Sequence, residues 1–407
     1  MSDLILKPGR EKSLVRRHPW IFSGAVRELL GKALPGETVT VRDARGSFLA
    51  SAAYSPASQI IARVWSWDEQ EAVDSRFFER RLRAAISSPY RQEALRNTQY
   101  AIRLVSAESD GLPGLIVDYY SGFLVIQSLT AGTEYWKAVI VQALSTLIAP
   151  VGIYERSELA VRQKEGLLLV RGTLAGETPP DRLEIEESGL RFLVDVKGGH
   201  KTGWYLDQRE SRKLVKEYAQ GREVLDVFCY SGGFTLLALE GGAMSVVCLD
   251  SAAGALELLG ENLELNGYSP EKTRSVGTGG PPDVWILEGD AFKVLREYRD
   301  AAKQFDLIIL DPPKFAHSAN QVERAARGYK DINLLAFKLL RPGGILFTFS
   351  CSGAIPPDLF QKIVAGAALD AGVEVQILRR LSQAPDHPVA LNFPEGEYLK
   401  GLVCLRS

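Results

Sequence analysis

The sequence predicts an α/β protein with a mostly parallel sheet in its C-terminal half and two smaller domains before it. At 407 residues the chain exceeds one ordinary domain. From about residue 183 onward, apolar runs alternate with helical patterns at the period of βαβ units. Before that point, short apolar runs are separated by turn residues. We therefore expect domains at 1–72, 73–180 and 181–407.

The composition is that of a globular protein with a large core, because 46% of the residues are hydrophobic and 24% are charged. No apolar run approaches the ~20 residues of a membrane span. The first ten residues lack a basic region followed by an apolar stretch and a cleavage site. We therefore expect a cytoplasmic protein that does not bind a membrane.

The chain has four cysteines and four histidines, which limits metal and disulfide chemistry. None of the cysteines at 229, 248, 351 and 404 lies in a C-x-x-C pair. We therefore expect no metal site and no disulfide framework. Each cysteine is then either an inert core residue or a nucleophile.

The net charge of −2 argues against indiscriminate nucleic-acid binding but allows local basic patches. Residues 76–103 hold seven arginines against two glutamates, and residues 197–216 hold six Lys/Arg residues against two acids. Each run fits either a nucleic-acid contact or the solvated face of a helix.

Residues 1–72 predict a small β-rich module with strands at 38–41, 48–52 and 60–64. The stretch RRHPWIFSG precedes these strands and places Arg17 and His18 beside Trp20. Cations next to aromatic rings suit phosphate contact and base stacking. A core role for the aromatic residues, with the arginines on the surface, explains the same spacing equally well.

Residues 73–180 predict a small α+β domain that ends in a linker at 175–180. An Arg-rich amphipathic helix with a tail is expected over 73–103, and one helix is expected over 134–149. The strand candidates are 102–106, 115–118, 123–128 and 167–172.

Beyond residue 183 the pattern predicts strands at 223–228, 245–249, 284–287, 305–310 and 345–350. Helices are expected at 207–219, 233–240, 253–265, 291–300, 323–340 and 356–371. Two later strands, 373–381 and 398–405, are joined by too short a connection for a helical crossover, so we expect an antiparallel pair. The Gly/Pro-rich residues 269–283 predict a surface loop.

Four successive strands of this half end in an acid, at Asp226, Asp250, Asp290 and Asp311. A single acid at a strand end is often only a helix cap. Four of them at one sheet edge indicate a pocket for a nucleoside joined to an amino acid.

The first of these acids opens the turn DVFCYSGGFT, which lacks the dinucleotide pattern G-x-G-x-x-G. An acid before such a turn suits the ammonium group of S-adenosylmethionine better than a pyrophosphate. In the same pocket Asp250 suits the ribose hydroxyls, and Asp290 suits the adenine amino group. The candidate ligand contacts are Asp226, Phe228, Tyr230, Ser231, Gly232, Asp250, Asp290 and Ala291.

The buried run 305–310 stops at DPPKF, because prolines cannot continue a strand ladder. This presents Asp311 at the carboxyl end of the strand, where open α/β sheets bind ligands. The next strand ends in FSCSG, so Cys351 is expected to emerge at the same edge. Taken alone, Asp311 also fits a turn cap and Cys351 a buried structural cysteine.

Six stretches together resemble one known family: RHPWIFSGA, GHKTGWYLDQR, DPPKF, RGYKDIN, FSCSG and YLKG. The chain is similar to class I S-adenosylmethionine-dependent ribosomal RNA large-subunit cytosine-5 methyltransferases that carry a PUA domain. The resemblance implies a PUA-like RNA-binding barrel at 1–72 and a Rossmann-like methyltransferase domain at 181–407.

In such enzymes the matching residues imply a nucleophile at Cys351, with Asp311 holding the cytosine. The resemblance adds Gln208 as a cofactor contact and ribosomal RNA as the partner. Lys314 then either lowers the thiol pKa or binds phosphate, or is an ordinary surface lysine. The implied RNA contacts are Arg17, His18, Trp20, Lys314, Arg327 and Lys330.

Two other functions remain open at this point. An RNA methyltransferase acting on a purine nitrogen would use Asp311 and its prolines to orient the base and would need no covalent step. An RNA-binding or ribosome assembly factor would keep the fold without catalysis. A homodimer is compatible with the sequence.

Overall fold

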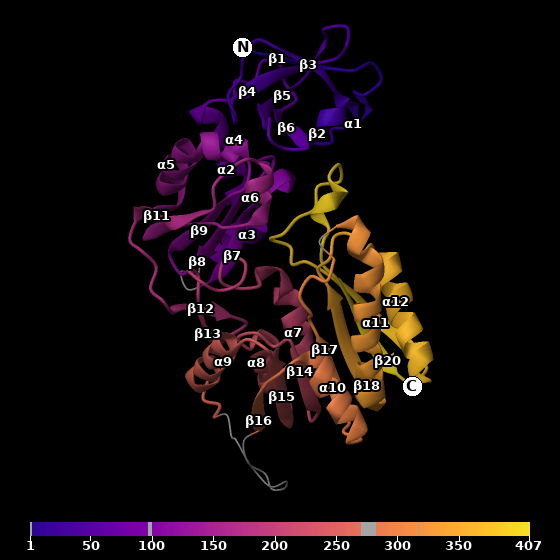
Figure 1. Ribbon diagram of the computed structural model, residues 1–407. Helices are drawn as coiled ribbons and strands as arrows, with labels where there is room; N and C mark the ends of the chain where they lie inside the picture. The colour runs from indigo at the N-terminus through magenta and orange to yellow at the C-terminus, as the bar shows by residue number, and fades with distance from the viewer. Residues whose placement is uncertain (1, 97–99, 270–281, 317) are drawn as a thin grey trace. The chain divides into compact units, whose positions relative to one another are not determined.

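The computed structural model describes residues 2–96, 100–269, 282–316 and 318–407 (Figure 1). The chain divides into two compact units, each of which gathers segments that are separate in sequence. The first unit contains residues 1–185, 195–206 and 385–396, and the second contains residues 186–194, 207–384 and 397–407. Most of the predicted loop at 269–283 lies outside the described residues. Within the described ranges, no helix combines the length and apolar character needed to cross a membrane.

The first unit begins with a six-stranded sheet in the order β2-β6-β5-β4-β1-β3. Its strands are β1 (Asp3–Leu6), β2 (Trp20–Phe22), β3 (Val26–Leu30), β4 (Thr38–Arg42), β5 (Phe48–Tyr54) and β6 (Ile60–Ser66). The three predicted strands are confirmed as β4, β5 and β6, and their apolar side chains form one buried cluster. A short helix α1 (Lys12–Val15) and a 3₁₀ turn (Ser23–Ala25) connect the remaining strands.

The second sheet of this unit has five strands in the order β11-β10-β9-β8-β7. They are β7 (Ala101–Ser106), β8 (Leu115–Tyr120), β9 (Phe123–Ser128), β10 (Gly152–Ser157) and β11 (Val170–Gly176). The helices are α2 (Ser75–Ile86), α3 (Pro89–Leu95), α4 (Ala131–Tyr135), α5 (Lys137–Ile148) and α6 (Ala160–Lys164), with a 3₁₀ turn at Ala107–Asp110. Phe77 and Phe78 of α2 pack into the core of this sheet.

Several sequence predictions for this region need correction. The helix expected over 134–149 is two helices that meet at Trp136, where the backbone ψ of 4° departs from helical geometry. The strand expected at 167–172 is displaced to Val170–Gly176, so the predicted linker at 175–180 begins inside β11. The Arg-rich segment over 73–103 forms two helices, of which α2 has the expected apolar face.

A small hairpin of β12 (Leu183–Glu187) and β13 (Leu190–Val194) begins in the last residues of segment 1–185 and continues into the second unit. The second unit also contains a seven-stranded sheet. The sheet order is β16-β15-β14-β17-β18-β20-β19. Its strands are β14 (Glu223–Val227), β15 (Ser245–Asp250), β16 (Asp283–Glu288), β17 (Phe305–Leu310), β18 (Leu340–Ser350), β19 (Val375–Ser382) and β20 (Lys400–Arg406). β14 to β18 run parallel, and β20 is antiparallel to both β18 and β19. The predicted parallel sheet with a terminal antiparallel pair is therefore confirmed.

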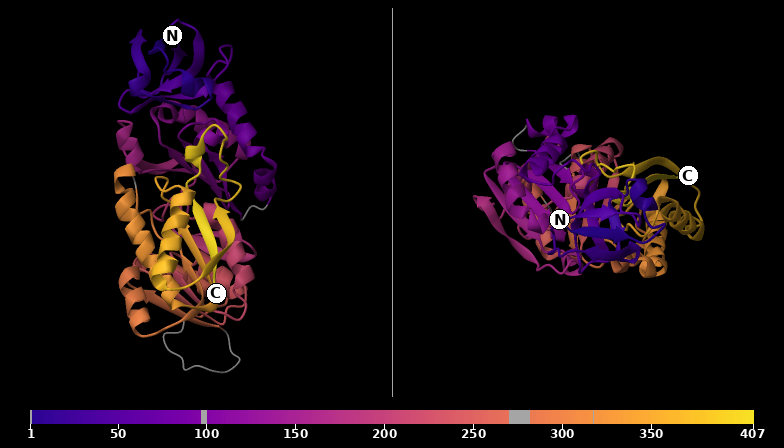
Figure 2. Two further views of the ribbon diagram at one scale, coloured as in Figure 1. Left: turned by 90° about the vertical axis from the view of Figure 1, so that its right-hand side faces the viewer. Right: turned by 90° about the horizontal axis from the view of Figure 1, so that it is seen from above.

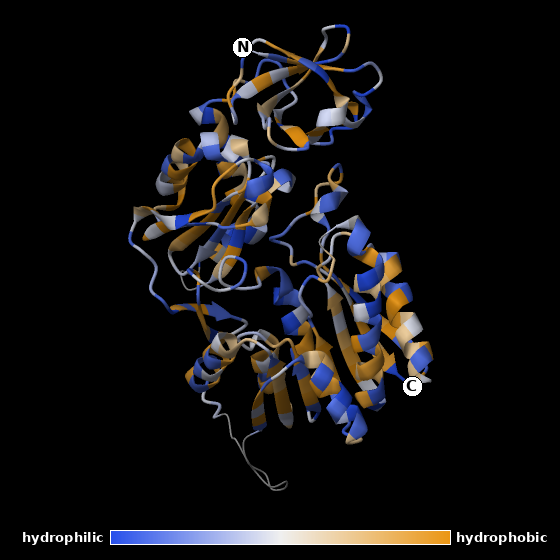
Figure 3. Cartoon of the chain, in the orientation of Figure 1, coloured by the Kyte–Doolittle hydropathy of each residue, from blue (hydrophilic) through white to orange (hydrophobic). Residues whose placement is uncertain are grey.

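Six helices pack on this sheet, close to their predicted positions. They are α7 (Arg209–Tyr218), α8 (Gly233–Glu240), α9 (Ala253–Leu265), α10 (Ala291–Asp300), α11 (Val322–Leu339) and α12 (Pro357–Ala371). Short 3₁₀ turns lie at Leu206–Gln208, at Ala319–Gln321 and, in the first unit, at Pro394–Gly396. Figure 1 shows α10, α11 and α12 side by side along the sheet. In Figure 2, left, β19 and β20 appear as adjacent yellow strands. The strands are largely apolar, and the helices carry mixed apolar and polar faces (Figure 3).

Candidate active site

The candidate site lies at the carboxyl edge of the seven-stranded sheet, where the strand order reverses between β14 and β17. To one side of this point the chain continues through β15 and β16, and to the other through β18. Ligands of open α/β sheets bind in the crevice outside the strand ends at such a switch point. The four predicted acids lie at this edge: Asp250 ends β15, Asp311 directly follows β17, Asp290 follows β16 by two residues, and Asp226 is the second-last residue of β14.

The loop after β14 has an unusual backbone, with three residues in the left-handed region. Phe228, Tyr230 and Gly232 all have positive φ angles, of 65°, 49° and 89°. Non-glycine residues rarely adopt this conformation, and it concentrates at ligand-binding sites. A side chain at Gly232 would place its Cβ 2.2 Å from a methyl carbon of Leu259, so the close packing of this turn also requires glycine. Ser231 is completely buried, and the amide of Asn262 donates to its carbonyl at 3.0 Å.

The side chain of Asp226 is completely buried, which is unusual for an acidic residue. Its Oδ2 accepts a hydrogen bond of 2.7 Å from the Thr235 hydroxyl, while its Oδ1 has no partner among the described residues. Burial raises the pKa of Asp226 to about 7, and the negative charges of Asp311 and Asp250 add to this shift. The group is therefore a costly buried acid that a cationic ligand would stabilise.

Asp250 and Asp290 both accept hydrogen bonds from backbone amides at this edge. Asp250 accepts hydrogen bonds from the Tyr230 amide at 2.9 Å and the Ala252 amide at 3.0 Å, so it fixes the loop after β14. Asp290 caps α10 by accepting from the Lys293 amide at 2.9 Å. Ala291 begins that helix and is buried. A carboxylate has about four acceptor positions, so these contacts leave capacity for ligand hydroxyl or amino groups.

Gln208, at the end of a 3₁₀ turn, is only 1% exposed. Neither its Oε1 nor its Nε2 has a hydrogen-bond partner within the described part of the chain. The buried hydroxyl of Ser231 also lacks a hydrogen-bond partner among the described residues. Buried polar groups without partners cost about 1–3 kcal/mol each. Both residues are therefore candidates for contact with a polar ligand.

Cys351 and Asp311 leave the sheet on neighbouring parallel strands. Leu310 of β17 pairs with Thr348 of β18, so Asp311 follows that pair by one residue and Cys351 by three. Both side chains are partly exposed, as a substrate contact requires.

Ser352 joins the two loops that carry these residues. Its hydroxyl accepts a hydrogen bond of 3.2 Å from the amide of Ala316, at the end of the DPPKFA stretch. The same hydroxyl lies 3.0 Å from the hydroxyl of Tyr329 on α11. All three residues are completely buried. The relative position of the Asp311 and Cys351 loops is therefore fixed by a buried serine.

The other three cysteines are poor candidates for a nucleophile, because each is buried. Burial raises the pKa of Cys229 and Cys248 well above the usual range, and it raises the pKa of Cys404 to about 12. A thiol rather than a thiolate is then present at neutral pH, and only the thiolate is a good nucleophile.

The predicted RNA contacts fall into two groups. In the second unit Lys314 is exposed, Arg327 pairs with Glu323, and Lys330 pairs with Asp370 at 2.8 Å. Exposed pairs of this kind are weak and exchange readily for a phosphate.

In the first unit Arg17 is exposed, whereas His18 and Trp20 are engaged by residues 385–396. The Trp20 ring lies 4.9 Å from that of Phe393, and its Nε1 donates to Glu108 at 2.8 Å. His18 lies 3.3 Å from Glu395. Trp20 thus already makes an edge-to-face ring contact and a hydrogen bond within the chain.

The basic run at 76–103 does not form the patch that its composition suggests. Arg80 and Arg81 pair with Glu71, and Arg83 pairs with Glu79. Arg91 and Arg103 are nearly buried and make bidentate pairs, Arg91 with Asp110 and Arg103 with Asp118. This run is mainly structural, because ion pairs neutralise most of it.

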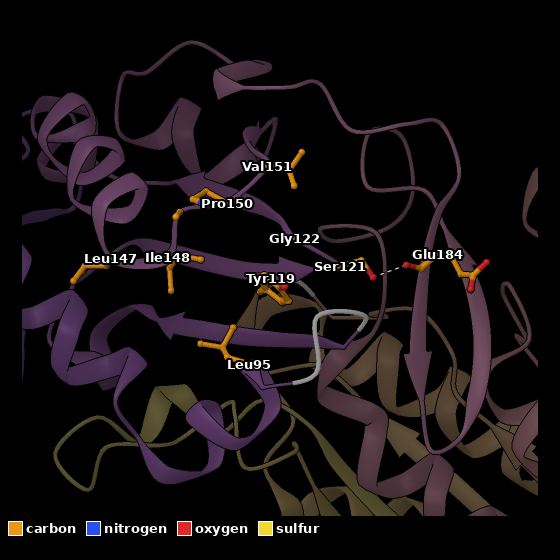
Figure 4. Close-up of a pocket in the computed structure, with 10 residues that line it drawn as sticks. Leu95, Tyr119, Ser121, Gly122, Leu147, Ile148, Pro150, Val151 and Glu184 are labelled. Atoms are coloured by element: carbon orange, nitrogen blue, oxygen red, sulfur yellow. Dashed lines mark hydrogen bonds between the residues drawn. The ribbon is translucent and has the colours of Figure 1, made fainter.

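A separate cavity of about 640 Å³ lies in the first unit (Figure 4). Tyr119, Leu147, Ile148 and Val151 supply the apolar part of its lining. The hydroxyl of Ser121 on its rim donates to the carbonyl of Glu184. None of the predicted site residues lines it. Among the residues described, no group of three or more His, Cys, Asp or Glu is arranged to hold a metal ion.

Sequence reasoning missed three residues that shape the edge: Thr235, Ser352 and Lys400. Thr235 and Ser352 lie within quoted motifs, but their partners are set by the fold. Lys400 lies opposite Ser350 in the β18–β20 pair, a register that sequence periodicity does not reveal.

Comparison with known proteins agrees with this architecture. Residues 166–399 match the family described as S-adenosylmethionine-dependent methyltransferase, and residues 4–67 match a PUA-like domain. Two similar curated proteins are called "Ribosomal RNA large subunit methyltransferase I". The one from Erwinia tasmaniensis is 52% identical and the one from Cronobacter sakazakii 51% identical, and each alignment covers 98% of both chains.

Solved structures show the same fold over the full chain. A SAM-dependent methyltransferase structure from Streptococcus mutans aligns with a TM-score of 0.83 at 21% identity, covering 100% of both chains. A methyltransferase structure complexed with SAH aligns with a TM-score of 0.84, also at 21% identity and with 100% coverage of both chains.

The edge built by β14, β15 and β16 fits S-adenosylmethionine in chemical terms. This ligand carries ammonium and sulfonium charges, which suit the buried carboxyl of Asp226. Its polar groups suit the unpartnered atoms of Gln208 and Ser231. The strained turn at 228–232 leaves room for close approach to the backbone.

Proposed function

Because this chain belongs to the S-adenosylmethionine-dependent methyltransferase family, we propose that it methylates carbon 5 of a cytosine in large-subunit ribosomal RNA, through a covalent bond to Cys351. The observation that carries this proposal is the pairing of β17 with β18, which brings the Asp311 and Cys351 loops to one edge. The names of the relatives that align over 98% of the chain support the ribosomal substrate.

The chemistry explains why a thiol and an acid are needed together. Carbon 5 of cytosine is a poor nucleophile until the ring is activated. The Cys351 thiolate adds to carbon 6, forming a C–S bond, while a proton reaches N3 with the help of Asp311. Carbon 5 then has enamine character and can accept a methyl group. Loss of the C5 proton to a base breaks the C–S bond and returns the thiolate, and N3 gives its proton back to Asp311.

S-adenosylmethionine supplies the electrophilic methyl group when it is bound. We assign its binding to Asp226, Gln208 and the turn 228–232, with Asp250, Asp290 and Ala291 at the next two strands. Asp226 holds a cationic group, and the amide of Gln208 and the hydroxyl of Ser231 satisfy polar ones. The two strand-end acids accept from hydroxyl and amino groups while keeping their backbone contacts.

We assign RNA binding to the N-terminal module and to the surface beside the Cys351 edge. Arg17 contributes an exposed charge. His18 and Trp20 contact RNA once their contacts with Glu395 and Phe393 are released. Near the chemistry, Lys314, Arg327 and Lys330 offer phosphate contacts. We propose that the protein acts in the cytoplasm, where it meets ribosomal RNA.

The test compares Cys351→Ala with Cys404→Ala in methylation of large-subunit RNA, followed by mapping of the modified base. We expect Cys351→Ala to lose methylation by a factor of roughly 10³ or more, because the covalent step is abolished. Cys404→Ala is the matched control, since Cys404 is buried on β20. Full activity of Cys351→Ala, with methyl groups on a purine nitrogen, would replace this proposal by a non-covalent one. Normal RNA affinity without binding of S-adenosylmethionine would indicate a non-catalytic factor.

A further inference from the structure

Lys400 is a buried lysine beside the cysteine loop, and the reaction just described leaves it without a role. Only 7% of it is exposed. It begins β20 and lies opposite Ser350, the last residue of β18 and the neighbour of Cys351. Burying an ammonium group is costly, so a lysine in this position needs a compensating interaction.

The Lys400 ammonium group holds the backbone of the loop that follows Cys351. Its Nζ donates to the carbonyl of Ser352 at 2.7 Å and to that of Ile355 at 2.8 Å. An ammonium group has three N–H donors, so these two carbonyls leave one donor for another acceptor. The charge therefore lies against the backbone of the residue that follows Cys351.

Four titratable groups surround this charge. Burial lowers the pKa of Lys400 to about 8, while the negative forms of Cys351 and Glu397 raise it and the charge of Lys314 lowers it. At pH 7 most of the lysine therefore remains charged. Tyr329 faces the same loop from α11, and burial raises its pKa, so it stays neutral.

We propose that Lys400 is a positioning residue that fixes the Cys351 loop and supplies the positive charge that stabilises the Cys351 thiolate. This inference rests on the proposed role of Cys351 as nucleophile. It assigns to Lys400 the electrostatic role that the sequence left open for Lys314. Lys314 is exposed and solvent screens its charge, whereas Lys400 is held in place by two hydrogen bonds.

The test measures the pH dependence of Cys351 alkylation by iodoacetamide, in which the thiolate sulfur forms a bond to carbon and iodide leaves. Mass spectrometry of the peptide reads Cys351 directly, and the other three cysteines are buried. In Lys400→Met we expect the midpoint of alkylation to rise by about one pH unit, with alkylation roughly tenfold slower at pH 7. Lys400→Arg should restore the midpoint, because it keeps the charge.

Lys314→Met and Lys362→Met are the matched controls, since both lysines are exposed. Both should leave the midpoint within about 0.3 pH unit of the unmodified protein. If Lys400→Met does not fold, Lys400→Gln replaces it, because the amide can still donate to the two carbonyls without a charge. An unchanged midpoint in a folded neutral variant overturns the inference, as does a Lys314→Met shift as large as that of Lys400.

This readout requires neither RNA nor S-adenosylmethionine, so it is independent of the proposed reaction. If Cys351→Ala keeps its methylation activity, the proposed function fails whatever the alkylation midpoint. If Cys351 is essential but the pH midpoint of its alkylation is unchanged in the Lys400 variants, only the inference about Lys400 fails.

Discussion

Replacement of Asp226 by asparagine separates what this residue does for the fold from what it does for the ligand. The carboxyl is completely buried, and only one of its oxygens has a partner among the described residues, the Thr235 hydroxyl. Asparagine has nearly the same shape and keeps an acceptor for Thr235, but it carries no charge. The variant therefore removes the buried charge with little change in packing.

The size and sign of the effect on stability follow from the pKa of Asp226. Burial raises this pKa from 3.8 to about 7 in the folded protein. Between these values the folded state keeps its proton while the unfolded chain has released it, so the free energy of unfolding falls as pH rises through this window. Across this window the free energy of unfolding changes by about 1.36 kcal/mol for each pH unit. About two pH units of the window, from pH 5 to the folded-state pKa of about 7, lie within the range of the assay. The protein should lose about 3 kcal/mol from this group between pH 5 and pH 8, and Asp226→Asn should not.

The assay is denaturant unfolding at pH 5 and pH 8 without ligand, combined with calorimetry of S-adenosylmethionine binding at pH 8. We expect the stability of Asp226→Asn relative to the unmodified protein to increase by about 3 kcal/mol across this range. Its affinity for the ligand should fall at least roughly tenfold, because a charged hydrogen-bond partner is lost. The unmodified protein should itself bind more tightly at pH 8 than at pH 6, since the ionised carboxyl favours a cation.

Asp306→Asn is the control, because it removes an acid from the other end of β17, where Asp306 pairs with Arg341 at 2.9 Å. That variant should be destabilised and should bind S-adenosylmethionine normally. The reasoning is refuted if the stability difference for Asp226→Asn is the same at both pH values, or if this variant binds the ligand like the unmodified protein.

Three further variants test other parts of the second unit. Gly232→Ala should lower the free energy of unfolding by about 1–3 kcal/mol and weaken S-adenosylmethionine binding, because its φ is 89° and its Cβ would meet Leu259; denaturation and calorimetry measure both effects. Ser352→Ala should cost about 1–3 kcal/mol in denaturant unfolding and lower the methylation rate without changing S-adenosylmethionine affinity, since two buried groups lose their partner; an unchanged rate would contradict the role of this serine. Arg212→Met should cost about 3–5 kcal/mol in the same unfolding assay, because it leaves the buried Glu187 without its bidentate partner; a loss below 1 kcal/mol would contradict this.

The sheet of the second unit was predictable because its strands are apolar and bounded by strong signals. β17 was placed correctly at both ends, since prolines follow it directly. The antiparallel arrangement of β19 and β20 followed from the shortness of their connection. The hairpin of β12 and β13 was missed although its strands alternate apolar and polar residues, because the two-residue turn Ser188-Gly189 between them was not recognised.

Local signals also failed where distant contacts decide the structure. The break at Trp136 follows from a separate capped turn, in which Thr130 and Thr133 form a capping box. The arginines of 76–103 suggested a nucleic-acid surface, but Glu71 and other acids from outside the run neutralise several of them. Sequence counts cannot show such pairs, because they depend on the tertiary fold.

For the candidate site, the sequence identified the residues that follow the strands but not those that support them. Asp226 and Asp311 were found because acids at strand ends form a recognisable pattern. Ser352 and Lys400 act through loop contacts and strand register, which periodicity does not encode. The roles of Cys351 and Asp311 remain predictions, and they rest on the arrangement at the β17–β18 edge.

The measurement closest to the central claim is a search for the bond between Cys351 and the RNA. A substrate RNA with 5-fluorocytidine at the methylated position cannot lose a proton from carbon 5, so the C–S bond should persist after methyl transfer. The account predicts a protein–RNA adduct that survives denaturing electrophoresis, requires S-adenosylmethionine, and maps to Cys351 by mass spectrometry. It would be contradicted by methylation of the normal RNA with no adduct on the fluorinated RNA, or by an adduct on any other residue.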